Sequence, residues 1–257
     1  MGFETILYEV TGGVAVITLN RPAVMNALST VMRTEMLAAV RLAQAEARVL
    51  VLTGAGRAFC SGQDLADVDI ATVDLEAVLR DEYEPLLTAI AACPLPVLAA
   101  VNGAAAGAGA GLALACDVVI AAESASFIQA FTRIGLVPDA GGSYWLPRQV
   151  GLARAMGAML FAEKVTAVQA ADWGMIWEAV PDEGFSAHWQ ARAAHLAAGP
   201  SLAYRGVKQA LRASFDNDFA AQLALEARLQ GECGKSADFR EGVAAFLEKR
   251  PAVFTGR

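Results

Sequence analysis

The chain has 257 residues, of which 56% are hydrophobic and 18% are charged, and its formal net charge is −7. This composition excludes an intrinsically disordered chain, and an acidic balance without a basic stripe argues against binding to nucleic acid. The sequence shows no apolar run suited to crossing a membrane and no signal peptide, so we expect a cytoplasmic protein without membrane contact. The four cysteines form no CxxC pair, so we expect neither a zinc site nor a disulfide framework.

Hydrophobic periodicity predicts that strands and helices alternate over the first two thirds of the chain. Strands are expected at 12–20, 48–54, 96–103 and within 116–127. Helices are expected from about Ser29, over 75–92, and then at 153–162, 166–173, 185–198, 200–214, 217–231 and 238–248. This order predicts an α/β fold that ends in an α-rich region.

The first predicted helix has a clear apolar face. Its spacing predicts burial of Met32, Met36, Ala39 and Ala43. The same spacing leaves Arg33, Arg41 and Gln44 on the other faces.

A glycine-rich segment, VNGAAAGAGAGLALACD, follows the strand at 96–103, and a helix is expected to start near Gly107. The first amides of a helix lack internal partners and carry partial positive charge, and glycine lets a ligand approach the backbone. The segment is therefore a candidate oxyanion site. A dinucleotide-binding fingerprint is excluded, because its last glycine would fall on Leu112. Close packing between helix and strand is an equal alternative to the oxyanion site as the reason for the glycines.

Two further segments place polar groups next to glycines. In GAGRAFCSGQDL, the loop around Gly62 and Gln63 is a candidate second donor of amide N–H groups, or an ordinary connection. In GLVPDAGGSYWLPR, Asp139 stands before a tight turn and a helix, where a helix N-cap is the common use of aspartate.

Other reactive side chains have structural interpretations. Cys60 has no base near it in the sequence, so we expect a buried structural thiol. His188 and His195 lie in an amphipathic helical segment without metal-binding spacing, and no metal site is expected.

Taken together, four segments resemble the enoyl-CoA hydratase/isomerase (crotonase) superfamily, in order and in spacing. They are LNRPAVMNALS, VLTGAGRAFCSGQDL, AAVNGAAAGAGAGLALACDVVIAAESASF and GLVPDAGGSYWLPRQVG. Within this family, PDAGGSYWLPR, DWGMIW and the tail GKSADFREGVAAFLEKRPAVFTGR are most similar to the isomerases of ring 1,2-epoxyphenylacetyl-CoA.

The resemblance implies a crotonase-like spiral of ββα units over 1–195 and a helical trimerisation region over 196–257. It implies a homotrimer or a dimer of trimers. The substrate would be an acyl-CoA thioester, with coenzyme A as part of the substrate and no separate cofactor. The phosphates of coenzyme A need cations, for which Lys249 and Arg250 are the candidates.

The resemblance also assigns roles to residues. The main-chain N–H groups of Gln63 and Ala108 would bind the thioester oxygen. Further substrate contacts are expected at Ala23, Val24, Ser61, Asp64, Leu65, Gly109, Phe131 and Tyr144. For the aromatic residues Phe127, Phe131, Tyr144 and Trp145, a place in the acyl-pocket wall and plain core packing are equal alternatives.

One departure from the family pattern bears on the reaction. Family hydratases use two glutamates to activate water, and their positions hold Gly111 and Phe131 here. Family isomerases place an acid where Asp139 stands. We therefore expect an isomerase in which Asp139 shuttles a proton, with a hydratase or another crotonase-type lyase as the alternative, and a non-catalytic acyl-CoA-binding protein after that.

Overall fold

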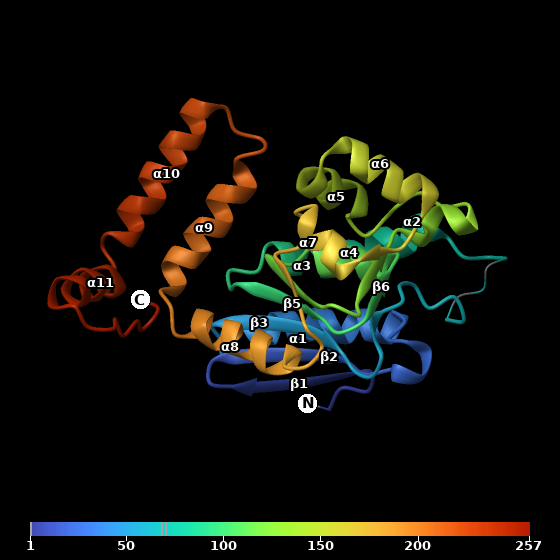
Figure 1. The fold of residues 1–257 in the computed structure, drawn as a ribbon, viewed down its shortest axis with the longest axis horizontal. Helices are drawn as coiled ribbons and strands as arrows, with labels where there is room; N and C mark the ends of the chain where they lie inside the picture. Colours follow the sequence, from blue (N-terminus) through green and yellow to red (C-terminus); the bar gives the residue numbers. More distant parts are fainter. Residues whose placement is uncertain (1, 68, 70) are drawn as a thin grey trace.

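The computed structural model describes residues 2–67, 69 and 71–257, and its strands lie mostly in the first half of the chain (Figure 1). The strands are β1 (Ile6–Thr11), β2 (Val14–Leu19), β3 (Val49–Gly54), β4 (Ala58–Cys60), β5 (Val97–Val101), β6 (Ala104–Ala106), β7 (Val118–Ala122), β8 (Ser126–Ile128), β9 (Val165–Thr166) and β10 (Glu178–Val180).

Helices connect the strands and then form the end of the chain. The α-helices are α1 (Thr30–Glu46), α2 (Leu75–Val78), α3 (Glu84–Ala91), α4 (Ala108–Leu114), α5 (Gly142–Val150), α6 (Leu152–Phe161), α7 (Ala167–Asp172), α8 (Phe185–Ala197), α9 (Ser201–Ala213), α10 (Phe219–Cys233) and α11 (Ala237–Glu248). The described residues also form the 3-10 segments η1 (Pro22–Val24) and η3 (Ala130–Ile134) and the π-helical segment η2 (Leu79–Tyr83).

Two sheets organise the first two thirds of the chain. The larger has the order β1-β2-β3-β5-β7-β10, and the smaller has the order β4-β6-β8-β9. Successive pairs β3–β4, β5–β6 and β7–β8 each give one strand to each sheet, and neighbouring units pair in parallel. This is the expected crotonase-like spiral of ββα units, and the α/β prediction is confirmed.

Glycine and asparagine make the corners where the chain passes from one sheet to the other. A Cβ at Gly54 would lie 2.4 Å from the Ala58 oxygen, and one at Gly103 would lie 2.2 Å from the Arg57 oxygen, so neither position has room for a side chain. Asn102 fixes the corner, because its side chain accepts from the Gly54 N–H at 3.1 Å and donates to the Gly56 oxygen at 2.9 Å.

The first helix begins where the sequence predicts, but one of its arginines lies in the core. Ser29 caps α1 by accepting from the Met32 N–H at 3.2 Å. Met32 and Met36 are buried as expected. The sequence places Arg33 on another face, and this prediction is wrong, because the residue is only 1% exposed and pairs with Glu82.

Helices α9, α10 and α11 stand to one side of the two-sheet core, whereas α8 lies along the larger sheet (Figure 1). The predicted boundary near residue 195 falls close to the end of α8 and stays a prediction. Within the described residues, no helix combines the length and the apolar character that a membrane crossing requires.

Candidate active site

The two predicted main-chain donors lie at the start of a helix and in a loop beside it. Gln63 follows β4, and Ala108 is the first residue of α4. The loop is held by a bridge to Leu28, whose N–H donates to the Gly62 oxygen at 2.8 Å and whose oxygen accepts from the Asp64 N–H at 3.2 Å. Among the described residues, neither the Gln63 nor the Ala108 N–H has a hydrogen-bond acceptor.

Glycines allow this loop to approach the helix. Gly62 has φ +96°, and a Cβ on it would lie 3.4 Å from the Ala108 nitrogen. A Cβ on Gly109 would lie 2.3 Å from the Cys60 oxygen. The structure thus brings the two free N–H groups together where the loop meets the start of α4, and there they can stabilise a negative oxygen. The packing alternative holds as well for Gly109, which is buried against the loop.

Asp139 is not the cap of the helix that follows it. The cap position of α5 is Gly141, and no side chain bonds there. The turn is tight, with φ 50° at Ala140 and 76° at Gly141. The Asp139 Oδ1 atom is buried and has no hydrogen-bond partner among the described residues.

Burial raises the pKa of Asp139 from 3.8 to about 6. Desolvation disfavours the charged form of a carboxyl group, and no cation near Asp139 offsets this effect within the described chain. A carboxyl group with such a pKa can accept and return a proton near neutral pH.

The turn that carries Asp139 packs directly on α4. A Cβ at Gly111 would lie 2.5 Å from the Ala140 oxygen and 2.9 Å from the Ala140 Cβ. Gly111 lies three residues after Ala108, or about 4.5 Å along the helix axis. Because Gly111 has no side chain, the turn that carries Asp139 can pack beside the first turn of α4.

Phe131 and Gln129 complete the surroundings. The Phe131 ring is buried and would contact a Cβ at Gly107, the residue before α4, at 3.8 Å. Gln129 is also buried, its Oε1 would lie 3.2 Å from a Cβ at Gly142, and neither polar atom of its amide has a described partner. The sequence does not single out Gln129, because a glutamine at the end of a strand carries no local signal of burial.

Two side chains that no motif in the sequence singles out hold Gln63. The Gln63 Oε1 accepts from Arg33 and from the Tyr83 hydroxyl. Tyr83 comes from η2 and is buried.

The other predicted contacts divide into two groups. Ala23 and Val24 form the exposed segment η1, and Ser61 is tied to it through its N–H on the Met25 oxygen at 3.0 Å. Leu65 is also exposed. The substrate contacts expected of these residues stay a prediction.

Asp64 and Tyr144 have neighbours in the protein. The Asp64 carboxylate is buried and pairs with Arg21 at 2.6 Å. Tyr144 is exposed, and Arg148 lies 3.6 Å above its ring. Phe127 belongs to the core in β8, and Trp145 is half-buried against Tyr144.

The remaining reactive groups lie outside this site or are inert. Burial raises the pKa of the Cys60 thiol to about 12, as expected for a structural thiol. His188 pairs with Glu178 at 2.8 Å. Arg250 pairs with Glu241 at 2.6 Å, and a guanidinium already engaged in this way is a poor anchor for a phosphate. Across the described ranges, no cluster of three or more His, Cys, Asp or Glu side chains is arranged to hold a metal ion.

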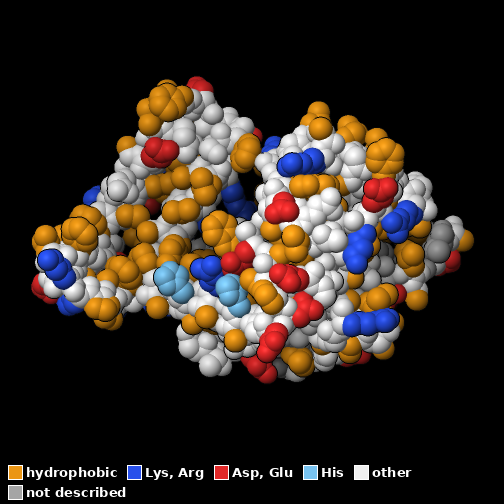
Figure 2. Space-filling model, viewed as in Figure 1, with side chains coloured by type: hydrophobic (Ala, Val, Ile, Leu, Met, Phe, Trp, Pro, Cys, Tyr) orange, Lys and Arg blue, Asp and Glu red, His pale blue; other side chains and the backbone are white. Residues whose placement is uncertain are grey.

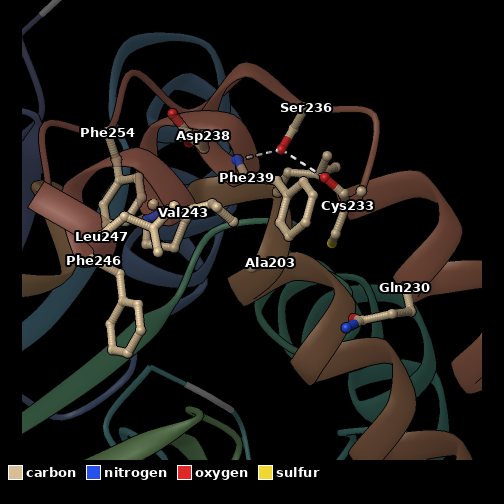
Figure 3. Close-up of a pocket in the computed structure, with 14 residues that line it drawn as sticks. Ala203, Gln230, Cys233, Ser236, Asp238, Phe239, Val243, Phe246, Leu247 and Phe254 are labelled. Carbon is tan, nitrogen blue, oxygen red and sulfur yellow. Dashed lines mark hydrogen bonds between the residues drawn. The ribbon is translucent and has the colours of Figure 1, made fainter.

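A separate apolar groove of about 490 Å³ lies in the helical region (Figure 3). Val243, Phe246, Leu247 and Phe254 contribute to its lining from α11 and the tail. Hydrophobic side chains gather over the same helices, and a hollow separates them from the core (Figure 2). No residue of the Asp139 site lines this groove.

The chain is similar to known proteins over nearly its whole length. The family model for enoyl-CoA hydratase/isomerase matches residues 9–257. A relative from Rhodobacter capsulatus named "Probable enoyl-CoA hydratase" is 69% identical over 100% of both chains. The 1,2-epoxyphenylacetyl-CoA isomerase of Escherichia coli is 45% identical, with 99% of both chains covered. The crystal structure of an enoyl-CoA hydratase from Bacillus anthracis superposes with a TM-score of 0.92 at 32% identity, covering 99% of this chain and 100% of the other.

Proposed function

The chain belongs to the enoyl-CoA hydratase/isomerase family, and from that premise we propose that it isomerises acyl-CoA thioesters with Asp139 as the proton shuttle. One observation carries the proposal. A carboxyl group with a raised pKa and an unpartnered oxygen lies beside a helix start where two main-chain N–H groups lack acceptors.

The reaction needs two proton transfers. The thioester oxygen binds between the N–H groups of Gln63 and Ala108, and Asp139 removes a proton from the carbon next to the carbonyl. The electron pair moves onto the oxygen as an enolate, which the two donors stabilise. Loss of one such donor typically raises the barrier by about 2.7–4 kcal/mol.

The same carboxyl group then returns the proton further along the conjugated system. In a straight-chain 3-enoyl ester, C4 receives the proton, and the double bond moves from C3–C4 to C2–C3. In ring 1,2-epoxyphenylacetyl-CoA, the same enolate chemistry permits opening of the ring to the seven-membered oxepin. Coenzyme A enters only as part of the substrate in this scheme.

Hydration is the second candidate, because the Rhodobacter relative carries a hydratase name. The site argues against rapid hydration by this chain. Gly111 has no side chain and the turn at Ala140 fills the space beside it, while Phe131 is apolar and buried. A pair of carboxylates that activates water therefore has no place at these positions.

We further propose that a second copy of the chain fills the groove at α9–α11, in a trimer or a dimer of trimers. Phe246 and Leu247 are 82% and 73% exposed in the single chain, which is costly for large apolar side chains in water. A symmetric assembly removes this surface from water.

A substrate panel tests the proposed function. We expect turnover of epoxyphenylacetyl-CoA or of straight-chain 3-enoyl-CoA esters, with slow addition of water to crotonyl-CoA. Asp139→Asn is expected to abolish turnover and to retain binding of the ester. Rapid hydration of crotonyl-CoA, or unchanged turnover in Asp139→Asn, would overturn the proposal.

A further inference from the structure

We propose that Tyr83 and Arg33 are positioning residues that aim the main-chain N–H of Gln63 at the thioester oxygen. This inference rests on the proposed function, in which that N–H is one of the two oxyanion donors. It assigns a role in the reaction to two buried polar side chains that belong to other parts of the chain.

The Gln63 side chain is held from two directions. Its Oε1 accepts from the Tyr83 hydroxyl at 2.5 Å and from the Arg33 Nη1 at 3.0 Å. Its Nε2 donates to the Asp64 oxygen at 3.3 Å. The Gln63 N–H shares its peptide plane with the Gly62 oxygen, which the Leu28 N–H holds at 2.8 Å. The bonds to the Gln63 side chain hold the other side of this residue, so main chain and side chain together set the direction of the N–H.

Arg33 fixes the opposite side of the same bridge. Its Nη1 also donates to the Leu28 oxygen at 2.6 Å, and that oxygen accepts from the N–H of Asp64, the residue after Gln63. One guanidinium thus ties α1 to both sides of the Leu28–Gln63 bridge. Burial of this charge is compensated by Glu82, whose Oε2 accepts from the Arg33 Nε at 3.0 Å.

Tyr83 packs on Arg33 within the same cluster. The Arg33 guanidinium lies 4.7 Å from the centre of the Tyr83 ring, and the hydroxyl is 3.4 Å from Arg33 Nη1. Burial raises the pKa of Tyr83 far above its usual value, and the charge of Asp139 adds to this effect. The hydroxyl therefore keeps its proton and remains a donor to Gln63 when Asp139 is ionised.

The expected effect follows from the geometry of oxyanion stabilisation. A donor that is present but misaligned loses part of its effect on the transition state, whereas binding of the coenzyme A portion is unchanged. We expect Tyr83→Phe to lower kcat by about tenfold with little change in KM, because removal of a whole donor costs about 100- to 1000-fold.

A spectroscopic measurement separates this role from a structural one. Binding of butyryl-CoA labelled with 13C at the thioester carbonyl is expected to lower the carbonyl stretching frequency in the wild-type protein. Tyr83→Phe is expected to reduce this shift. Tyr8→Phe is the matched control, since it removes a tyrosine hydroxyl bonded to Glu46 at the surface, at 3.0 Å, and is expected to leave the shift unchanged.

Gln63→Met provides an independent test, since it keeps the main-chain N–H and removes the Oε1 acceptor. It is expected to reproduce the Tyr83→Phe effect, and the double variant is expected to be no worse than either single variant. If both single variants keep the wild-type kcat and the wild-type carbonyl shift, the positioning role is overturned. If the wild-type protein itself shows no carbonyl shift, the proposed oxyanion site fails, and the inference fails with it.

Discussion

Replacing the proposed base with its neutral isostere is expected to stabilise the protein. The pKa of Asp139 is raised from 3.8 to about 6 by burial, so the folded protein holds a proton on this group at pH values where the unfolded chain has lost it. Stability therefore falls as pH rises from about 4 to 6, and the full penalty remains above that range. Asparagine cannot ionise and avoids the penalty.

The magnitude follows from the size of the shift. Raising the pKa of Asp139 from 3.8 to about 6 corresponds to about 3 kcal/mol, because a tenfold change in proton affinity is worth about 1.36 kcal/mol. Because Asp139 is only half-buried and water screens part of its charge, we expect a gain of about 1–2 kcal/mol for Asp139→Asn at pH 7.5. The gain should shrink towards zero as the pH approaches 4.

Urea unfolding at pH 5, 6 and 7.5 measures this difference. Asp182→Asn is a control for which the expected change in stability has the opposite sign, because the Ser124 N–H holds the pKa of the exposed Asp182 below its usual value. That variant is expected to lose stability at pH 7.5 and to approach the wild type as the pH falls. A difference for Asp139→Asn that is independent of pH, or a loss of stability at pH 7.5, would refute the reasoning.

Three further outcomes are expected. The value of kcat/KM should rise as the pH increases through about 6, the pKa of Asp139. A rise of kcat/KM in a different pH range would assign the base to another group. Gly111→Ala should cost about 1–3 kcal/mol of stability and lower kcat, since its Cβ would meet the Ala140 oxygen at 2.5 Å, whereas Gly157→Ala, with open space around it, should do neither. Phe246→Asp, in the groove, should shift sedimentation towards a smaller species, and an unchanged species would place the contact between copies elsewhere.

The sequence predicts the buried elements of the fold better than its short ones. Strands β2, β3, β5 and β7 are apolar runs ending at glycines or turns, and periodicity locates each of them. The strands β4 and β6 are three residues each of small or apolar type, AFC and AAA, and such stretches look like loops until a neighbouring strand pairs with them. The second sheet of the spiral is therefore predicted only by the family resemblance.

In the site as well, residues with a local signal in the sequence are predicted, and residues whose role depends on distant partners are not. Gln63, Ala108 and Asp139 stand next to glycines in the sequence, and this local signal is sufficient to single them out. Arg33 carries no such signal, because its burial depends on Glu82, 49 positions away. The approach of Gly111 to Ala140 likewise depends on how two helices pack, which no local pattern records.

Hydrogen exchange at the carbon next to the thioester carbonyl tests the central role of Asp139 most directly. In D2O, the wild-type protein is expected to incorporate deuterium at this carbon of a bound acyl-CoA, as followed by proton NMR. Asp139→Asn is expected to bind the ester and to leave this carbon fully protonated. Incorporation by Asp139→Asn at the wild-type rate would contradict the account.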